Sequence, residues 1–543
     1  MEMFENVINW LNDMVWSQPS KFPLMVALLL SFGIFITLRL GFIQIRKFKH
    51  GILSVMGKFD DPDAIGDVNH FQALTTALSA TVGIGNIAGV AIAIHYGGPG
   101  ALFWMWVTAF FGMAVKFTEC TLAVKYRVQN ADGSVSGGPM YYIEKGLGAN
   151  WKWLAMFFAV MAVICSFLTG NAVQANTVAD TLYSTFALPG WITGIVTATI
   201  VGVVIIGGIK RIGNVTARLM PLMALIYVLG ALIILLINFQ EIIPAFKTIF
   251  TGAFNPQAGM YGVVTGAFLT TLVWGIKRGL FSNEAGQGSA PIAHGAARTK
   301  EPVREGVVAL LEPFIDTLVV CTMTGLVIVS TGVYQQRHDI PFNPNGKEVS
   351  YNIDSGSTLI VDEGVPTNGQ IIVNEATTGV IFVGGSSSKE KFSGTIKVDN
   401  GKTLITTETG TVVKDLHADI VENGAPLTSL AFENGLAPLF PGGKYIVTLC
   451  VLLFGISTAI SWSYYGDRAI QYLAGDKSII YYKFVYVAMH FVGAILTLET
   501  VWAIGDIALG LMTFPNIIAL FALSGVVATS TKTYFKKMNE AKS

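Results

Sequence analysis

Windows of about 20 apolar residues recur along the whole chain, and each is long enough to cross a hydrocarbon core of roughly 30 Å as a helix. Hydrophobic residues make up 52% of the 543 positions and charged residues only 13%, a far more apolar composition than that of a soluble protein. The formal net charge is zero, and no basic tract indicates a nucleic-acid partner. We therefore expect an all-α polytopic membrane protein.

The apolar windows, and the Gly, Pro and charged residues that interrupt them, predict about eleven transmembrane helices. The first window has an acidic N-terminal flank and no small-residue cleavage site, so we expect a permanent span and not a signal peptide. The predicted helices lie near residues 22–43, 72–97, 100–126, 152–186, 190–207, 217–238, 261–294, 306–333, 443–471, 480–498 and 501–529.

Lysine and arginine residues concentrate in every second loop of this arrangement. The intervening turns near Gly98, Pro189 and Glu499 carry almost none. Because basic loops remain in the cytoplasm, the pattern predicts an N-terminus outside the cell (inner) membrane and a cytoplasmic C-terminus.

Residues 335–442 differ from the rest of the chain because they are polar and alternate in hydropathy. Short runs such as STLIVDEG, GQIIVNEA, GVIFVGG, GTIKVDN and KTLITTET are separated by Gly, Asn and Asp, which predicts about five or more strands and no helix. The expected organisation is a peripheral helix at 1–45, core helices at 46–334, a β-rich extracytoplasmic insert at 335–442, and core helices with a cytoplasmic tail at 443–543.

The stretch TVGIGNIAGVAIAIHYGGPG, residues 81 to 100, places glycines 83, 85 and 89 around one amide, Asn86. Glycines at this spacing allow either close helix packing or a break in the helix, and both readings stay open. Asn86 favours the break, because a mid-span amide needs hydrogen-bond partners and its oxygen suits an alkali cation. Unwound carbonyls can coordinate Na⁺, while the N–H groups of a half-helix attract a carboxylate.

A second interrupted span is expected at residues 266 to 291, GAFLTTLVWGIKRGLFSNEAGQGSAP. It contains four glycines, Asn283 and Pro291. If the first helix is peripheral, the two interrupted helices are the first and sixth of ten. That spacing is typical of an inverted repeat whose discontinuous helices hold a substrate at the midplane.

Three motifs then resemble one family. They are GIGNIAGVAIAIHYGGPGALFWMW, SGGPMYYIEKGLG at 136 to 148, and WGIKRGLFSNEAGQGSAPIAHGAART at 274 to 299. Together they resemble the alanine or glycine:cation symporters over all of the chain except the insert, which departs from the family pattern. The resemblance implies a LeuT-like five-plus-five fold after one peripheral helix, and Na⁺-coupled uptake of small neutral amino acids.

The resemblance also implies substrate contacts from four core helices. Gln174 could equally make an interhelical hydrogen bond, and the aromatic residues would close over a small side chain. The candidate substrate-binding residues are Gly85, Asn86, Gly89, Gln174, Trp274, Gly275, Gly279, Phe281 and Trp462.

Hydroxyl groups on the eighth core helix, opposite the first break, form the candidate sodium site. Each hydroxyl could also bond to its own helix, so the grouping supports the site more than any one residue. The candidate sodium ligands are Thr81, Val82, Asn86, Ser457, Thr458 and Ser461.

Ionisable residues inside predicted spans are functional candidates by default. We expect gating or coupling ion pairs near the cytoplasmic ends, formed by Glu119 with Lys116, Glu312 with Asp316, and Arg278 with Glu284. A coupling proton would be carried by Glu284 or Glu312. His294 is expected to be a capping or surface residue.

The leading functional hypothesis is secondary active symport of alanine or glycine with Na⁺, and serine or glutamine stay open as substrates. Proton-coupled symport on the same fold is the alternative, and a channel or an intramembrane enzyme is more distant. GxSxG, HExxH and nucleotide-loop motifs are absent, so no enzyme activity and no cofactor are expected. The insert could cover the outer vestibule or contact an envelope partner.

Overall fold

The structure is a computed structural model of the full chain. It describes residues 10–540 apart from 12–13, 17, 19–22, 62, 131–132, 255–266, 343–348, 354–356, 374–375, 384–389, 400–401, 414–415 and 497.

Long apolar helices form the larger part of the molecule. Among the described residues seven are long and apolar enough to cross a membrane, or eight when the bent pair His70–Thr81 and Gly85–Gly97 is counted as one span. The main helices are α2 (Leu24–Arg39), α7 (Ala101–Lys125), α9 (Lys152–Phe167), α10 (Val173–Phe186), α11 (Gly190–Ile206), α12 (Gly208–Ile237), α14 (Ala267–Asn283), α18 (Thr322–Thr331), α20 (Gly443–Ala474), α21 (Ser478–Ile495) and α22 (Leu498–Glu540). Helices α9 and α10 belong to one of the seven spans, and α18 is the last part of another, whereas α2, α11 and α14 are shorter.

Shorter helices complete the bundle or connect the long ones. They are α3 (Ile43–Arg46), α4 (Phe48–Val55), α5 (His70–Thr81), α6 (Val90–Gly97), α8 (Pro139–Leu147), α13 (Phe239–Phe254), α15 (Ala290–His294), α16 (Pro302–Ala309), α17 (Leu311–Pro313) and α19 (Gly424–Leu436). Three π-helical segments, η1 (Gly85–Gly89), η3 (Leu168–Ala172) and η4 (Phe314–Cys321), interrupt longer helices. Two 3₁₀ turns are η2 (Ala149–Trp151) and η5 (Val333–Gln335).

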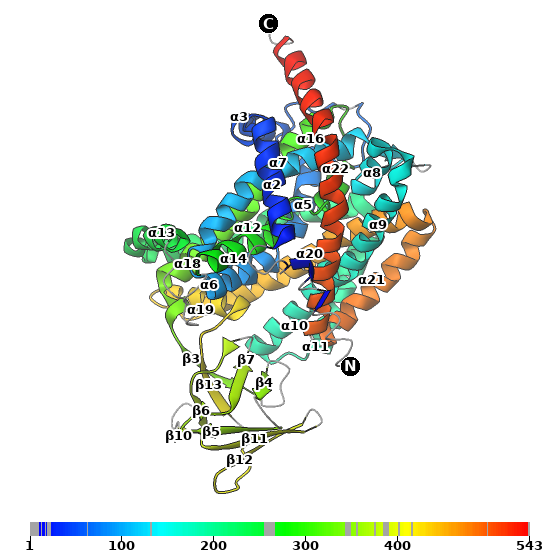
Figure 1. The fold of residues 1–543 in the computed structure, drawn as a ribbon. Coiled ribbons are helices and arrows are strands. Elements are labelled where there is room, and N and C mark those ends of the chain that lie inside the picture. The colour runs from blue at the N-terminus through cyan, green and yellow to red at the C-terminus, as the bar shows by residue number, and fades with distance from the viewer. Residues whose placement is uncertain are drawn as a thin grey trace.

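Each predicted span contains helix in the described part of the chain, although the first six residues of the 261–294 prediction lie outside it. The amphipathic helix α13 was not predicted. Its apolar side chains Phe239, Ile243 and Phe250 are exposed, whereas Ala245 and Ile249 are buried. It protrudes from one side of the bundle (Figure 1).

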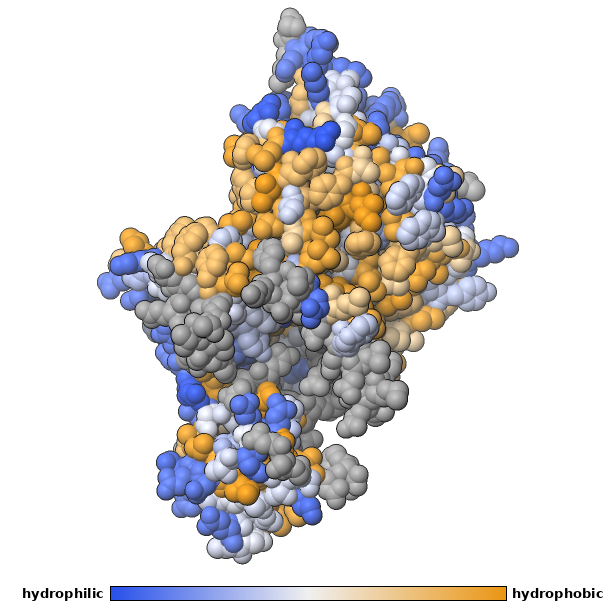
Figure 2. Space-filling model, viewed as in Figure 1, coloured by the Kyte–Doolittle hydropathy of each residue, from blue (hydrophilic) through white to orange (hydrophobic). Residues whose placement is uncertain are grey.

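A broad apolar band covers the face of the helical part seen in Figure 2, with hydrophilic residues above and below it. Helices α11, α12 and α21 also expose large apolar side chains, among them Leu, Ile, Val and Phe. An exposed apolar area of this extent is unfavourable in water and favourable in a bilayer.

Eleven of the described strands lie between the helices α18 and α19 and form three antiparallel sheets. The sheet orders are β10-β9-β13-β3, β12-β11-β5-β6 and β4-β7-β8. A separate core of alternating residues, including Leu359, Ile371 and Ile396, is fully buried, as period-2 patterning requires. The strands are β3 (His338–Phe342), β4 (Val349–Ile353), β5 (Thr358–Asp362), β6 (Val365–Pro366), β7 (Gly369–Val373), β8 (Ala376–Thr377), β9 (Ile381–Val383), β10 (Glu390–Lys391), β11 (Gly394–Asp399), β12 (Lys402–Thr407) and β13 (Leu416–Ile420).

The prediction that residues 335–442 contain no helix is wrong at their C-terminal end. Strand β13 ends at Ile420, and α19 follows and packs against α20, α18 and η1. Thr428 of α19 donates a hydrogen bond to the carbonyl oxygen of Ile87 (2.9 Å). This helix therefore belongs with the bundle and not with the sheets.

The β-sheets and the C-terminal end of α22 lie at opposite ends of the helical bundle (Figure 1). Helices α3, α8 and α16 lie at the same end as the C-terminus. A short hairpin of β1 (Val128–Gln129) and β2 (Val135–Ser136) follows α7.

Candidate functional site

Helix α5 breaks at Val82, whose ψ of 90° is extended. The chain then bends by 54° before it continues through η1 and α6. Gly83 is required here because a Cβ would lie 2.7 Å from the hydroxyl oxygen of Thr458 on α20. The last carbonyls of α5 thus lie at a helix end, where intrahelical donors are lacking. The structure agrees with the reading of this stretch as a break.

Asn86 stabilises the break through its side-chain amide. Its Oδ1 accepts a hydrogen bond from the backbone N–H of Gly83 (2.8 Å), which replaces part of the lost helical bonding. Its Nδ2 lies 2.6 Å from Oδ1 of Asp316 and 3.1 Å from Oγ of Ser282. Asn86 therefore joins three helical segments, and its oxygen bonds to the backbone at the break. That this oxygen also binds Na⁺ stays a prediction.

Asp316 is a residue of this site that the sequence reasoning placed elsewhere, as a partner of Glu312. It lies in η4, is fully buried, and accepts hydrogen bonds from the hydroxyls of Ser282 and Thr317, each at 2.7 Å. Within the described residues no Lys or Arg forms an ion pair with it. A charged residue inside the apolar run FIDTLVVC is the signal that could have identified it.

The predicted hydroxyl group cluster on α20 lies beside this break. Thr458 Oγ1 donates to the carbonyl oxygen of Ser79 (3.1 Å). Ser457 and Ser461 are fully buried, and their hydroxyl oxygens have no hydrogen-bond partner among the described residues. Buried polar atoms without partners are costly in a folded protein, and they are the expected feature of a site that binds an ion. Thr81 and Val82, the other predicted ligands, are buried at the end of α5.

Gln174 and Trp462 each lie against another interruption, the π-helical segment η3. The Trp462 ring occupies the space beside Gly170, where a Cβ would overlap it. Gln174 donates from Nε2 to the carbonyl oxygen of Thr169 (3.1 Å), while its Oε1 has no partner among the described residues. Both side chains are buried. One interpretation of Gln174 was a hydrogen bond to another helix. The structure instead shows a hydrogen bond to the backbone of its own helical segment.

Glycine 89 borders open space. A Cβ built there would meet nothing within 4 Å, although Gly89 itself is buried. One turn earlier, a Cβ at Gly85 would lie 3.4 Å from the Phe281 ring. The first break thus combines a void next to Gly89 with an aromatic wall at Phe281.

The second predicted break lies between α14 and α15. Glu284, Gly286 and Gly288 all have positive φ angles, and Pro291 occupies the first turn of α15. Glu119 of α7 accepts hydrogen bonds from the N–H of Gly288 (3.0 Å) and from Asn516 of α22 (2.6 Å). These contacts keep the non-helical backbone buried in the protein. At membrane depth such a backbone is tolerated only where protein or a water-filled cavity surrounds it.

Two predicted substrate contacts on α14 have a packing role. A Cβ at Gly275 would overlap the carbonyl oxygen of Ala101, and one at Gly279 would lie 3.2 Å from Met105 of α7. Both glycines therefore allow α14 to approach α7 closely. Trp274 stacks on Tyr96 of α6 with ring centroids 4.6 Å apart, which places it near the end of α6.

The predicted ion pairs are rearranged. Lys116 pairs with Glu312 at 3.1 Å, and Glu284 accepts a hydrogen bond from the hydroxyl of Ser289. The Arg278 guanidinium lies over the rings of Trp274 and Phe281, 5.4 and 5.8 Å from their centroids.

The expectation for His294 is wrong. This residue is fully buried, and its ring nitrogens contact Glu305 and Glu312 at 2.5 and 2.7 Å. Both carboxylates come from the helices that follow it, 11 and 18 positions further along the chain.

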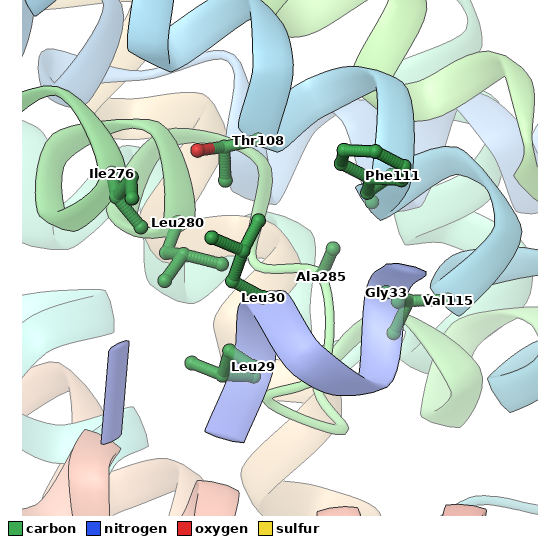
Figure 3. Close-up of a pocket in the computed structure, with 10 residues that line it drawn as sticks. Leu29, Leu30, Gly33, Thr108, Phe111, Val115, Ile276, Leu280 and Ala285 are labelled. Atoms are coloured by element: carbon green, nitrogen blue, oxygen red, sulfur yellow. The ribbon is translucent and has the colours of Figure 1, made fainter. Parts of the chain in front are cut away.

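A small pocket between α2, α7 and α14 contains none of the predicted site residues (Figure 3). Leu29, Leu30, Phe111 and Ile276 line it. The hydroxyl of Thr108, which also borders it, donates to the carbonyl oxygen of Trp104 (2.8 Å). Thr108 is the one residue with a polar side chain among the described residues that line the pocket, and none of these residues is charged. The pocket therefore fits the ammonium and carboxylate groups of an amino acid poorly.

The model of the sodium:alanine symporter family matches residues 1–350 and 384–543. The chain belongs to this family. The match includes residues 335–350 and 384–442, so the expectation that the whole insert departs from the family pattern is wrong for these residues. Only residues 351–383, whose described part includes β5, β7 and β9, lie outside the match.

Several relatives of this sodium:alanine symporter family member align over nearly their whole length. Sodium/alanine symporter AgcS of Methanococcus maripaludis is 41% identical over 542 residues, covering 99% of each chain. Probable sodium/glutamine symporter GlnT of Bacillus subtilis is 30% identical over 100% of this chain and 93% of the relative. Amino-acid carrier protein AlsT of the same organism is 30% identical over 99% and 93%.

A crystal structure of a manganese transporter from Eremococcus coleocola covers 86% of this chain and 82% of its own, at 11% identity and a TM-score of 0.40. This likeness is too distant to inform the site. Family membership and the apolar helices make the chain an integral membrane protein and a cation-coupled amino-acid transporter, not an enzyme.

Proposed function

We propose that the protein takes up small neutral amino acids, such as alanine or glycine, by symport with Na⁺. The observation that carries the proposal is the pair of buried hydroxyls, Ser457 and Ser461, which lack hydrogen-bond partners beside the broken helix α5–α6. The two residues are four positions apart and so share one face of α20. Hydroxyl and carbonyl oxygens are hard ligands that suit an alkali cation.

Na⁺ would bind between the end of α5 and this face of α20. Thr81 and Val82 supply backbone carbonyls, and Ser457, Thr458 and Ser461 supply hydroxyls. Thr458 already bridges the two helices through the carbonyl of Ser79. A bound ion would therefore hold the broken helix against α20, and its release would free the two to separate.

Asp316 supplies negative charge to the same region. Its carboxylate contacts Asn86, and Asn86 contacts Gly83 at the break. A buried carboxylate without a basic partner is costly, and a nearby cation lowers that cost. Na⁺ binding and the closed arrangement of α5, η1 and η4 would therefore stabilise each other, and such coupling is reciprocal.

The amino acid would occupy the space beside Gly89, between the two broken helices. Phe281 and Trp462 limit its size, and Gln174 offers an unpartnered amide oxygen to its ammonium group. Trp274 and Arg278 lie further toward the end of α6 and would act on access to the site. Walls formed by the Phe281 and Trp462 rings would favour alanine or glycine over larger side chains.

The two interrupted helices, five core helices apart, support a LeuT-like inverted repeat with alternating access at the midplane. The alternation of basic loops supports an N-terminus outside the cell (inner) membrane, a cytoplasmic C-terminus and an extracytoplasmic insert. Proton-coupled symport on the same fold is the alternative.

Binding of labelled L-alanine to purified protein tests this proposal. We expect binding in Na⁺ and at least tenfold weaker binding when choline replaces Na⁺ at fixed pH. Ser461→Ala should weaken the Na⁺ dependence, whereas Ser463→Ala, whose hydroxyl donates to the carbonyl of Ile460 (2.7 Å), should retain it. Equal binding in Na⁺ and choline would overturn Na⁺ coupling.

A further inference from the structure

A row of ionisable side chains runs from the surface into the bundle and is separate from the proposed Na⁺ and amino-acid sites. Neighbours are hydrogen-bonded from His70 inward, and Asp60 lies 3.8 Å from His70. The row begins at Asp60, whose side chain is 48% exposed, and ends at fully buried Lys116. Its links are Asp60–His70 (3.8 Å), His70–Glu305, Glu305–His294 (2.5 Å), His294–Glu312 (2.7 Å) and Glu312–Lys116 (3.1 Å).

The number of protons at His294 follows from its partners. Its Nδ1 faces Oε1 of Glu305 and its Nε2 faces Oε1 of Glu312. An ionised carboxylate only accepts hydrogen bonds, and a neutral imidazole has one N–H. Two hydrogen bonds need two protons, so these three residues together hold one proton more than a neutral histidine with two carboxylates.

Charge balance favours the same state. With His294 as an imidazolium, the two positive groups, His294 and Lys116, match the two carboxylates, Glu305 and Glu312. Without the extra proton this fully buried group would carry one net negative charge, which is costly in a low dielectric. His70 needs only its Nδ1 proton, since its Nε2 has no hydrogen-bond partner among the described residues.

Titratable and charged side chains face His294, Glu305 and Glu312 from every element packed against α15. They are His70 on α5, Lys116, Glu119 and Cys120 on α7, Glu284 in the second break, Tyr465 on α20, and Arg127, which acts on Glu305; Glu305 and Glu312 themselves lie on α16 and α17. The ligand atoms of Cys120, His294 and Glu312 lie within 4.8 Å of one another. The Lys116 ammonium on Glu312 disfavours a metal ion there.

We propose that His294, Glu305 and Glu312 form a proton-binding site that holds one exchangeable proton while α15, α16 and α17 are packed together as in this structure. A proton arriving past Asp60 adds to Nε2 of His70. Nδ1 of the same ring gives its proton to Oε2 of Glu305, which leaves His70 with one proton, on Nε2. Rotation of the Glu305 carboxyl group then presents its O–H to Nδ1 of His294, which takes the proton and leaves the carboxylate ionised. Each transfer forms one N–H or O–H bond and breaks another, so no co-reactant is needed.

The proton-binding site lies next to both broken helices, so movement of either helix would change its contacts. His294 is the last residue of α15, and Glu312 lies one turn before Asp316, the partner of Asn86. Both carboxylates that face His294 lie on α16 and α17. Separation of α15 from these two helices would therefore remove both acceptors of His294 and release the proton. This step rests on the proposed function, because it takes the packed arrangement of these helices as one state of a transport cycle.

The first test does not depend on transport. Protein labelled with ¹⁵N-histidine in lipid nanodiscs is examined by NMR at pH 8, above the ordinary histidine pKa of about 6.5. We expect the signal of one histidine with both nitrogens protonated, and this signal should be missing from the spectrum of His294→Gln. The control is His417→Gln, which removes a histidine that pairs with a carboxylate in the insert; its spectrum should keep the signal. A neutral His294 ring at pH 8 would overturn the proposal.

If His294→Gln does not fold, His294→Gln/Glu305→Gln replaces it, because that variant leaves the Lys116–Glu312 pair and overall neutrality intact. The second test is Na⁺-driven alanine uptake at equal pH on both sides, from pH 6 to 9. One linked proton changes the ratio of the packed to the separated arrangement by up to about tenfold per pH unit.

We therefore expect wild-type uptake to rise with pH and the double variant to show a flat profile. If the wild type and the double variant both transport alanine and their uptake depends on pH in the same way, the proposal is contradicted. Absence of Na⁺-driven uptake in the wild type would instead overturn the proposed function, while the NMR result would still decide the proton site.

Discussion

The amide nitrogen of Asn86 lies 2.6 Å from a carboxylate oxygen of Asp316, although the two residues are 230 positions apart. The contact joins the first broken helix to the π-helical segment η4. Thr324 adds a second connection, since its hydroxyl donates to the backbone carbonyl of Asn86 (2.8 Å). The non-helical turn at Val82 and Gly83 is therefore held by one polar cluster shared between distant segments.

Asp316→Asn removes the negative charge of this cluster and keeps its shape. Because the carboxylate would stabilise a nearby cation, we expect the Na⁺ concentration for half-maximal uptake to rise at least tenfold. Asp339→Asn, which removes a carboxylate in the insert, serves as the control and should leave it unchanged. An unaltered Na⁺ dependence in Asp316→Asn would show that this charge plays no part in ion binding.

Ser457→Ala and Ser461→Ala remove hydroxyls that have no partner among the described residues. Without Na⁺ we expect melting temperatures equal to that of the wild type or higher, because no hydrogen bond is lost. A saturating ligand stabilises the folded state by about 2.7 kcal/mol at 100 times its Kd. This Na⁺-dependent rise in melting temperature should be lost in both variants and kept in Ser463→Ala.

Gly89→Ala places a methyl group in open space, so the fold should be retained. The methyl group would compete with the side chain of the amino acid. We expect the preference for alanine over glycine to fall by at least about tenfold, the usual effect of one methyl group in a closed site. Competition of each amino acid with labelled glycine measures this ratio.

Gly275→Ala is the contrasting variant, because its Cβ would overlap the backbone of α7. We expect a lower melting temperature and lower yield with no change in substrate preference. If Gly275→Ala were as stable as the wild type and had an altered substrate preference, Gly275 would contact the substrate and the packing role would be contradicted.

Glu422, between the strands and α19, gives a pH dependence outside the spans. Burial raises the pKa of its carboxyl group to about 7, against the lowering effect of the Asn423 N–H. The folded state therefore binds this proton more tightly than the unfolded state, and stability falls as the pH rises from about 4.5 through 7. Glu422→Gln should raise the melting temperature at pH 8 and leave it nearly unchanged at pH 4.5. Equal melting curves at pH 8 would contradict the shift.

Local sequence patterns were enough to predict the helical segments, both breaks and five strands, although only seven or eight of the described helices are long and apolar enough to cross a membrane. The glycines around Asn86, and the run from Glu284 to Pro291, weaken helix formation within a few residues, and this is a local property. Alternation in runs such as KTLITT likewise predicts a strand without reference to the rest of the fold.

The partners of buried polar groups could not be predicted in the same way. Asp316 was assigned to Glu312 because the two are close in sequence, yet its contacts are Asn86 and Ser282 on other helices. His294 was expected near the surface because a basic loop follows it, but two later helices cover it with carboxylates. Such contacts depend on how distant segments pack, which no local pattern encodes.

The most direct measurement is uptake of labelled L-alanine into proteoliposomes under an inward Na⁺ gradient, repeated with choline in place of Na⁺ at fixed pH. We predict accumulation that requires Na⁺ and is abolished in Asn86→Ala, checked for folding by its elution as a single monodisperse species. Accumulation of equal extent in choline would contradict Na⁺-coupled symport at this site.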